Sequence, residues 1–310
     1  MQQTLAREFS LRGIGLHSGA DVTVIVRPAP ANHGINFVRS DISDLNNTIP
    51  AKWNYVVDTT LCTVIGNEDG VSLKTIEHLM AALRGCDIDN AEIEVNGPEI
   101  PSLDGSSQFF VSEIEKAGIK QQSDTRLYLK VLKKVEVELD DKYACLAPSD
   151  LSEFSGEITY DHPLIQHQTY KTSLINGNFA HKLAATRSFC LLEDVEKMKK
   201  MGLIKGGSLD NAIVLEGNRV LNPGGLRFKD EFIRHKILDA VGDLYLAGAP
   251  ILGAYHGVKC GHALNNALLV SLFSDDKAYT WVKSEKLSET ISKTGIEVSQ
   301  SERVSYFVNA

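Results

Sequence analysis

One stretch decides most about the fold of this chain: Lys229-Asp-Glu-Phe-Ile-Arg-His-Lys-Ile-Leu-Asp-Ala-Val-Gly-Asp-Leu-Tyr-Leu246. Its apolar residues recur at helical spacing and supply one apolar face, which predicts an amphipathic helix packed on a core. Because residues four apart stack on the same side of a helix, His235 and Asp239 can reach one point, and Asp243 lies a further turn along. The segment therefore combines a fold element with candidate functional side chains.

Hydrophobic periodicity predicts further helices and strands along the chain. Helical spacing recurs at three places: Ser72 to Leu83, Gln108 to Ala117 and Glu193 to Met201. Apolar and polar residues alternate, as in half-buried strands, at four others: Val22 to Val26, Ala91 to Val95, Leu127 to Val131 and Val135 to Leu139. The two kinds of element are mixed without a regular βαβα rhythm. We therefore predict an α+β architecture in which helices cover one face of each sheet.

The chain length and one polar stretch predict two domains. A chain of 310 residues is longer than a typical single domain. The polar residues 120–126 separate a predicted helix from a new run of strands, which is typical of a domain boundary. We place the first domain at 1–122 and the second at 123–310.

Composition and charge exclude several classes of protein. The formal net charge of -8 argues against nucleic acid as a partner, since binding phosphates requires a clustered basic surface. The N-terminus lacks a basic start followed by an apolar stretch, and no apolar run is long enough to cross a membrane. The five cysteines form no C-x-x-C pair, so neither a disulfide framework nor a thiolate zinc site is indicated. We expect a cytoplasmic protein without stable membrane insertion.

Three side chains from two predicted helices are candidate metal ligands. His235 and Asp239 offer an imidazole and a carboxylate, which a metal such as zinc accepts, although such pairs are more often surface ion pairs. His78 follows Glu77 on a mostly apolar helix, where a carboxylate rarely lies without a partner. Glu77 and His78 could bind a metal with the first pair or form a salt bridge to the other domain. Spacing alone leaves both alternatives open.

His262 is a further candidate, within Lys259-Cys-Gly-His-Ala-Leu-Asn-Asn266. A lone loop histidine is more often a packing or capping residue than a catalyst. Its role depends on Asp243, because a neighbouring carboxylate would hold the imidazole protonated if the two residues meet in space.

Together these segments resemble the UDP-3-O-acyl-N-acetylglucosamine deacetylases, zinc hydrolases that open the committed stage of lipid A synthesis in Gram-negative bacteria. The resemblance extends over nearly the full chain and implies two similar domains, each a β-sheet with paired helices, with the helices sandwiched between the sheets. It rests on these segments: Gly13-Ile-Gly-Leu-His-Ser-Gly19, Asp58-Thr-Thr-Leu-Cys-Thr63, Thr75-Ile-Glu-His-Leu79, Ile100-Pro-Ser-Leu-Asp-Gly-Ser106, Asp161-His-Pro163, Gly206-Gly-Ser-Leu-Asp-Asn211, Leu226-Arg-Phe-Lys-Asp-Glu-Phe-Ile-Arg-His-Lys-Ile-Leu-Asp239 and Gly261-His-Ala-Leu-Asn-Asn266.

Carried over residue by residue, the resemblance implies a site for one catalytic zinc ion. Its ligands would be His78, His235 and Asp239, and three protein ligands leave an open position for water. Fe(II) could occupy the same ligand set.

The resemblance also implies the residues that carry the chemistry. Glu77 would be the general base, and His262, oriented by Asp243, would stabilise the oxyanion and protonate the departing amine. Ser188 stands in an Arg-Ser-Phe stretch where the family has threonine, and would keep the hydroxyl donor for the oxyanion. Lys236 would face the substrate's phosphates or the site.

The implied substrate is an acylated UDP-amino sugar. Tyr160 could stack on its uracil or be a core or edge-strand tyrosine, and both alternatives stay open. A βαβ insert at about 187–215 would form a hydrophobic passage for the acyl chain; without the resemblance, its apolar residues would be ordinary core. The implied contacts are Leu61, Cys62, Phe189, Leu191, Val195, Ile204, Gly207, Ser208, Ala212 and Val214.

Two other classes of protein stay open on the sequence alone. The chain could be a non-catalytic binder of sugar nucleotides or lipids, because a fold and a pocket do not guarantee turnover. It could also be a different metal-dependent hydrolase that acts on small amides. We expect a monomer.

Overall fold

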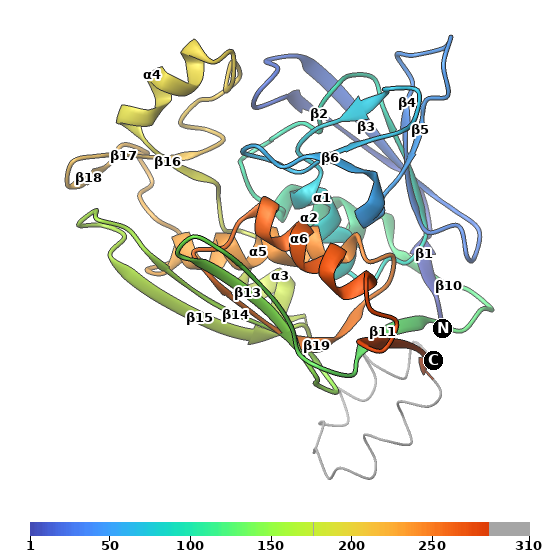
Figure 1. The fold of residues 1–310 in the computed structure, drawn as a ribbon. Helices are drawn as coiled ribbons and strands as arrows, with labels where there is room; N and C mark the ends of the chain where they lie inside the picture. The colour runs from blue at the N-terminus through green and yellow to red at the C-terminus, as the bar shows by residue number, and fades with distance from the viewer. Residues whose placement is uncertain (176, 285–310) are drawn as a thin grey trace.

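The computed structural model describes residues 1–175 and 177–284, and Figure 1 shows their arrangement. The strands up to residue 121 are β1 (Gln3–Leu5), β2 (Phe9–Ile14), β3 (Asp21–Pro28), β4 (Ile35–Arg39), β5 (Thr48–Pro50), β6 (Val56–Asp58), β7 (Val64–Gly66), β8 (Ser72–Leu73), β9 (Ala91–Val95) and β10 (Ile119–Gln121). The later strands are β11 (Leu127–Val131), β12 (Val135–Leu139), β13 (Lys142–Ala147), β14 (Ser152–Thr159), β15 (His167–Ser173), β16 (Phe189–Leu191), β17 (Ile213–Glu216), β18 (Arg219–Val220), β19 (Ile251–Val258) and β20 (Tyr279–Lys283). The helices are η1 (Trp53–Tyr55, a 3-10 turn), α1 (Glu77–Gly85), α2 (Gln108–Ala117), α3 (Asn178–Lys182), α4 (Leu192–Lys200), α5 (Glu231–Tyr245) and α6 (His262–Phe273).

Four helices form a layer between two sheets. One sheet has the strand order β2-β3-β9-β4-β5, and the other contains β12-β13-β19-β11-β20 with β14 and β15 branching from β19. In Figure 1, α1, α2, α5 and α6 lie between these sheets. Helix α5 packs on β14 and β15, whereas α6 packs on β12 and β13. The predicted α+β architecture, with helices sandwiched between sheets, is therefore confirmed.

Strand β3 shows why the predicted alternation produces these sheets. Val22, Val24 and Val26 are fully buried, whereas the residues between them are half-exposed. Because successive side chains of a strand point to opposite faces, the three valines enter the core together. Burying a valine side chain contributes about 1.5 to 3 kcal/mol, so the register is strongly preferred. The predicted strands at Ala91 to Val95 and Leu127 to Val131 correspond to β9 and β11.

The predicted helix at Ser72 to Leu83 is wrong in its first turn. Ser72 and Leu73 form β8, which pairs with β7, and α1 begins only at Glu77. Between them Thr75 has a φ of 59°, a left-handed conformation that a right-handed helix cannot contain. Leu73 is buried in a strand and Leu79 in a helix, so the apolar spacing spans two elements.

Gly242 explains how closely the two central helices approach each other. A Cβ atom added at this position would lie 2.0 Å from the backbone oxygen of Glu77. Glycine inside a helix costs about 1 kcal/mol relative to alanine, so the contact is made at the expense of helix propensity. Asp239 and Asp243 lie on either side of Gly242 along α5. The close crossing places their side chains beside the first turn of α1.

The β16-α4-β17 unit, called the insert here, differs from the rest of the fold. Strands β16 and β17 pair in parallel, and β18 extends the small sheet to Val220, beyond the boundary near 215 expected from the sequence. No residue of α4 is buried. Figure 1 shows α4 well away from the central helices. The insert therefore adds a wall to the molecule rather than a share of its main core.

The division into two domains stays a prediction. The expected boundary at residue 122 lies between β10 and β11, and β10 pairs with β1 near the N-terminus. The expected second domain continues to residue 310, and residues 285–310 lie outside the described residues. Among the described residues, no helix is long and apolar enough to cross a bilayer.

Candidate active site

Two histidines and one aspartate converge where α1 meets α5. His78 lies in the first turn of α1, and His235 and Asp239 are one turn apart on α5. Their ligand atoms lie within 4.8 Å of one another. The Oδ1 atom of Asp239 is 3.5 Å from Nε2 of His78 and 3.3 Å from Nε2 of His235. All three residues are buried, so these helices hold three candidate donors around one point.

The charges and hydrogen bonds of Asp239 and His235 fit a bound cation. Oδ1 of Asp239 is buried and has no hydrogen-bond partner among the described residues, which is costly for a carboxylate oxygen unless a ligand occupies that position. Burial lowers the pKa of His235 to about 3, so its ring is neutral, as a metal ligand must be. Nδ1 of His235 lies 3.1 Å from the carbonyl oxygen of Thr186, which accepts its proton and leaves Nε2 facing Asp239.

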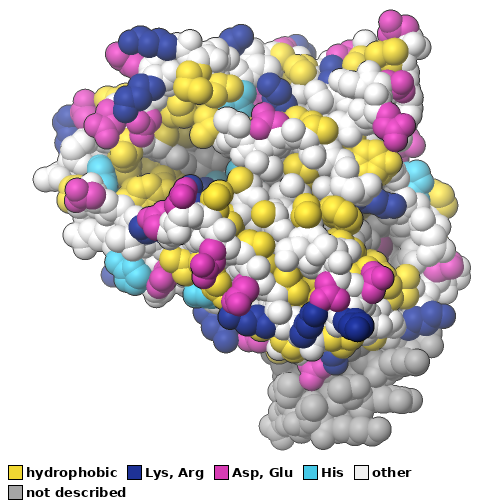
Figure 2. Space-filling model, viewed as in Figure 1, with side chains coloured by type: hydrophobic (Ala, Val, Ile, Leu, Met, Phe, Trp, Pro, Cys, Tyr) yellow, Lys and Arg dark blue, Asp and Glu magenta, His cyan; other side chains and the backbone are white. Residues whose placement is uncertain are grey.

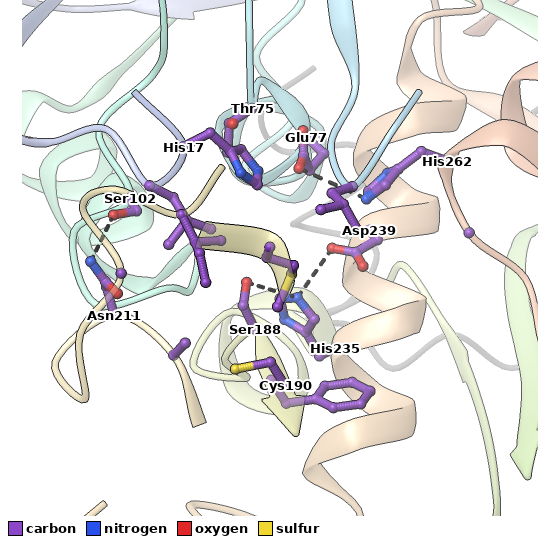
Figure 3. Close-up of a pocket in the computed structure, with 18 of the residues that line it drawn as sticks. His17, Thr75, Glu77, Ser102, Ser188, Cys190, Asn211, His235, Asp239 and His262 are labelled. Atoms are coloured by element: carbon purple, nitrogen blue, oxygen red, sulfur yellow. Dashed lines mark hydrogen bonds and ion pairs between the residues drawn. The ribbon is translucent and has the colours of Figure 1, made fainter. Parts of the chain in front are cut away.

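Glu77 begins α1 directly before His78, and its side chain points toward His262 (Figure 3). Its side chain is buried, and burial raises the pKa of this carboxyl above its ordinary value. The backbone N–H of Thr63 donates to Oε2 at 3.1 Å, while Oε1 lies 3.9 Å from Nε2 of His262. A buried carboxylate with a raised pKa suits the acceptance and release of a proton near neutral pH.

His262 and Asp243 meet in space. Nδ1 of His262 lies 2.9 Å from Oδ2 of Asp243, and Asn265 donates to the same oxygen at 2.8 Å. Burial opposes a charge on the His262 ring, but Asp243 and Glu77 outweigh it and raise the pKa of His262 to about 9. The condition that the sequence left open is therefore met: the imidazole has a carboxylate partner that keeps it protonated at neutral pH.

Ser188 and Lys236 complete the polar surroundings. Oγ of Ser188 lies 3.2 Å from Nε2 of His235, on the side of the ring that faces the site (Figure 3). Nζ of Lys236 donates to Oδ2 of Asp239 at 3.3 Å, and Asp239 raises the pKa of this half-buried lysine although desolvation opposes the rise. Lys236 therefore places a fixed positive charge next to the candidate ligands.

These side chains line a cavity of about 650 Å³ that runs from the helix interface to the insert. In Figure 2, hydrophobic side chains gather around a hollow beside the insert. Of the predicted substrate contacts, those that line the cavity are Tyr160, Leu61, Phe189, Val195, Ile204, Gly207, Ser208, Ala212 and Val214. One end of the cavity is thus polar and charged, and the other is mostly apolar.

Two predicted contacts lie elsewhere. Cys62 is buried behind the cavity wall. Leu191 packs against a small hydrophobic cluster with Phe232 and Ile233, while its neighbour Cys190 faces the cavity. Tyr160 is 38% exposed at the cavity, so it is not a core tyrosine.

Sequence reasoning missed several residues of the cavity. His17 is buried there, and neither of its ring nitrogens has a hydrogen-bond partner within the described part of the chain. Its only signal was a histidine among glycines at residues 13–19. Lys142 also lines the cavity, but in the sequence a lysine that follows Asp140-Asp141 is typical of a solvent-exposed turn. Leu61, Thr75 and Ile204 have positive φ angles at the cavity wall, and such strain often occurs at functional sites.

The fold and the site define a class of protein. A buried pair of histidines with an aspartate, open to a cavity and flanked by a buried carboxyl group and a further imidazole, is the arrangement of a metal-dependent hydrolase.

Comparison with known proteins identifies the family within this class. Residues 2–274 match the UDP-3-O-acyl N-acetylglycosamine deacetylase family. A UDP-3-O-acyl-N-acetylglucosamine deacetylase of Myxococcus xanthus is 47% identical over 92% of this chain and 90% of its own length. Proteins with the same name from Shewanella oneidensis and Phenylobacterium zucineum are each 45% identical, over 92% and 90% of this chain and 94% and 95% of their own lengths. The chain belongs to the UDP-3-O-acyl-N-acetylglucosamine deacetylase family.

Proposed function

We propose that this chain hydrolyses the 2-acetamido group of a UDP-3-O-acyl-N-acetylglucosamine, releasing acetate and the free 2-amino sugar. In the pathway implied by the family, this is the committed step of lipid A synthesis. The observation that carries the proposal is the meeting of His78, His235 and Asp239 at one point of the cavity wall, with Glu77 and His262 beside them.

The ion best suited to this site is Zn²⁺. Two imidazoles and one carboxylate are common ligands of catalytic zinc, and Fe(II) accepts the same set. When bound, such an ion supplies Lewis acidity, which polarises a carbonyl group and lowers the pKa of water.

The residues of the chain divide the proton transfers between them. The oxygen of a water molecule attacks the acetamide carbon. As this bond forms, the carboxylate of Glu77 accepts a proton from the water. Nε2 of His262, 3.9 Å from Oε1 of Glu77, donates a proton to the leaving nitrogen as the C–N bond breaks. Asp243 holds the charged imidazole in orientation through Nδ1. The hydroxyl of Ser188 donates to the oxyanion that develops on the carbonyl oxygen.

The two ends of the cavity suit the two ends of the proposed substrate. Lys236 and Lys142 line the cavity and provide cations for a diphosphate, although the chain as a whole is acidic. Tyr160 lines the same cavity and offers a partly exposed ring for uracil. The apolar wall of the insert suits an acyl chain, and each buried CH₂ group contributes about 0.8 kcal/mol. We place the protein in the cytoplasm, where UDP-sugars are made.

The proposal is tested by an assay of acetate release from acylated UDP-N-acetylglucosamine, with Glu77→Ala as the matched variant. We expect the wild-type chain to turn over this substrate, and Glu77→Ala to lose at least about a hundredfold in kcat while it still binds the substrate. A non-catalytic binder would show no turnover, and the variant would be indistinguishable from the wild type. Equal activity on simple N-acetylglucosamine would indicate a hydrolase of small amides instead.

A further inference from the structure

Thr63 contacts both halves of the proposed proton-transfer machinery. It lies between Cys62 and the start of β7 and is 2% exposed. Its backbone N–H donates to Oε2 of Glu77 at 3.1 Å. Its hydroxyl donates to Oδ1 of Asp243 at 2.6 Å, although 180 positions separate the two residues in the chain. One residue therefore holds two buried carboxylates that belong to different helices.

The hydrogen bonds of Asp243 show why the threonine hydroxyl matters. Oδ2 of Asp243 accepts from His262 and from Asn265, which both belong to α6. Oδ1 accepts from Thr63, which lies directly before β7 in the first half of the chain. The two bonds from α6 hold one oxygen of the carboxylate and the bond from Thr63 holds the other, so the three bonds together restrict rotation of the carboxylate about its Cβ–Cγ bond. Without the hydroxyl, Oδ1 would be a buried charged acceptor that has lost its partner.

The side chain of threonine suits this connection. Its two branches at Cβ restrict the rotation of χ1, so the hydroxyl has a narrow range of positions relative to the backbone N–H. The distance between the two accepting oxygens, Oε2 of Glu77 and Oδ1 of Asp243, is therefore restricted by the backbone and the stiff side chain of Thr63. Because Asp243 in turn holds Nδ1 of His262, the same unit influences the 3.9 Å between Nε2 of His262 and Oε1 of Glu77.

We propose that Thr63 is a positioning residue for the deacetylation, which sets the proton acceptor Glu77 and the proton donor His262 at their working separation. It holds Glu77 through its backbone and His262 through Asp243. The inference rests on the proposed function. It assigns to Thr63 no contact with the substrate, and Thr63 does not line the cavity.

The test compares two pairs of proteins, and the members of each pair differ in the hydroxyl at position 63. The first pair is the wild type and Thr63→Val, and the second is Thr63→Ser and Thr63→Ala. Thr63→Val removes the hydroxyl at nearly constant shape and leaves the backbone bond to Glu77 in place. We expect kcat to fall about tenfold, since a hydrogen bond to a charged group is lost, while KM stays within about twofold of the wild type. In the second pair, Thr63→Ser should keep most of the activity and Thr63→Ala should lose as much as Thr63→Val. The second pair decides the matter if Thr63→Val does not fold.

A double-mutant cycle separates positioning from general damage. If Thr63 acts through Asp243, adding Thr63→Val to Asp243→Ala should cost no further activity. Metal content and thermal unfolding are measured on each variant, and we expect one ion per chain throughout.

The results that overturn the inference are distinct from those that overturn the proposed function. An unchanged kcat in Thr63→Val, a loss confined to KM, equal activity of Thr63→Ser and Thr63→Ala, a full additional loss in the Asp243→Ala background, or loss of the bound ion would each refute the positioning role. An inactive wild-type chain would refute the proposed function, and this inference with it.

Discussion

The crossing of α1 and α5 and the insert both form walls of the same cavity, yet they are built in opposite ways. At the crossing, charged side chains are buried between closely packed helices, and Glu77 and Asp243 each have partners from more than one element. In the insert, a small sheet carries a helix without buried residues, and the cavity wall is mostly apolar. The first region fixes the positions of individual polar atoms through hydrogen bonds, whereas the second shapes an apolar volume.

The difference teaches where each kind of substitution should act. Hydrogen bonds and ion coordination depend steeply on geometry, so changes at the crossing should remove function almost completely. Apolar contacts add up by area, so changes in the insert should alter affinity in steps and depend on the substrate. The following predictions test this contrast.

Removing a candidate ligand should have the largest effect. In Asp239→Ala the site loses a carboxylate, and we expect the chain to bind no stoichiometric ion and to lose about a thousandfold or more in kcat/KM. Metal analysis and the acetate-release assay measure this. Asp230→Ala, near the start of the same helix and away from the cavity, is the control and should keep both the ion and the activity. Full activity in Asp239→Ala would contradict the assigned ligand set.

Replacing the proton donor should reduce activity and change its dependence on pH. The pKa of His262 is raised to about 9, so its ring carries a proton at neutral pH and loses it as the pH rises through that value. Activity of the wild type should therefore fall on the alkaline side near this pKa. In His262→Gln we expect kcat to drop about a hundredfold and the alkaline limb to disappear. If the limb persists in the variant, another group provides it.

Adding one methyl group at the helix crossing should damage the site from a distance. The Cβ of Gly242→Ala would meet the backbone oxygen of Glu77, so α5 must move away from α1. We expect a loss of about 1 to 3 kcal/mol in the free energy of unfolding, although alanine favours helices, together with weaker metal binding. Gly224→Ala is the control because no atom lies within 4 Å of its added Cβ. Thermal unfolding and metal titration compare Gly242→Ala with Gly224→Ala. Equal stability of the two variants would show that α1 and α5 can move apart without a loss of stability.

Narrowing the insert should have the smallest effect and the most selective one. Ala212→Phe places a ring in the apolar part of the cavity. We expect KM for a long-chain acyl substrate to rise about tenfold, with little change in kcat or in KM for a short-chain analogue. Met201→Ser, on the exposed side of the insert, should change neither constant. A fall in kcat that is independent of chain length would place Ala212 in the chemistry instead.

The sequence was sufficient where a pattern is local. Periodicity predicted α2 at its observed bounds and α5 to within two residues at the start, and alternation predicted β9 and β11. It failed at α1 because the left-handed turn at Thr75 has no hydrophobic signature, so a strand and a helix were merged. Leu191, a predicted substrate contact, packs against the cluster of Phe232 and Ile233 and is not among the residues that line the cavity, a packing arrangement that no local pattern reveals.

The candidate site was predictable in its residue types but not in its contacts. His235 and Asp239 are neighbours on one helix, so their pairing follows from spacing. The pairing of His78 with Asp239, or of Thr63 with Asp243, joins distant parts of the chain and depends on how two helices cross. The close contact at Gly242 that permits this crossing is invisible in a single sequence, because glycine also occurs where only a turn is needed.

The most direct test of the account is the metal content of the purified chain after loading with zinc, read together with its circular dichroism. The account predicts one tightly bound ion per chain in the wild type and in Glu77→Ala, and none in Asp239→Ala. A correctly folded wild-type chain that retains no divalent ion would contradict it.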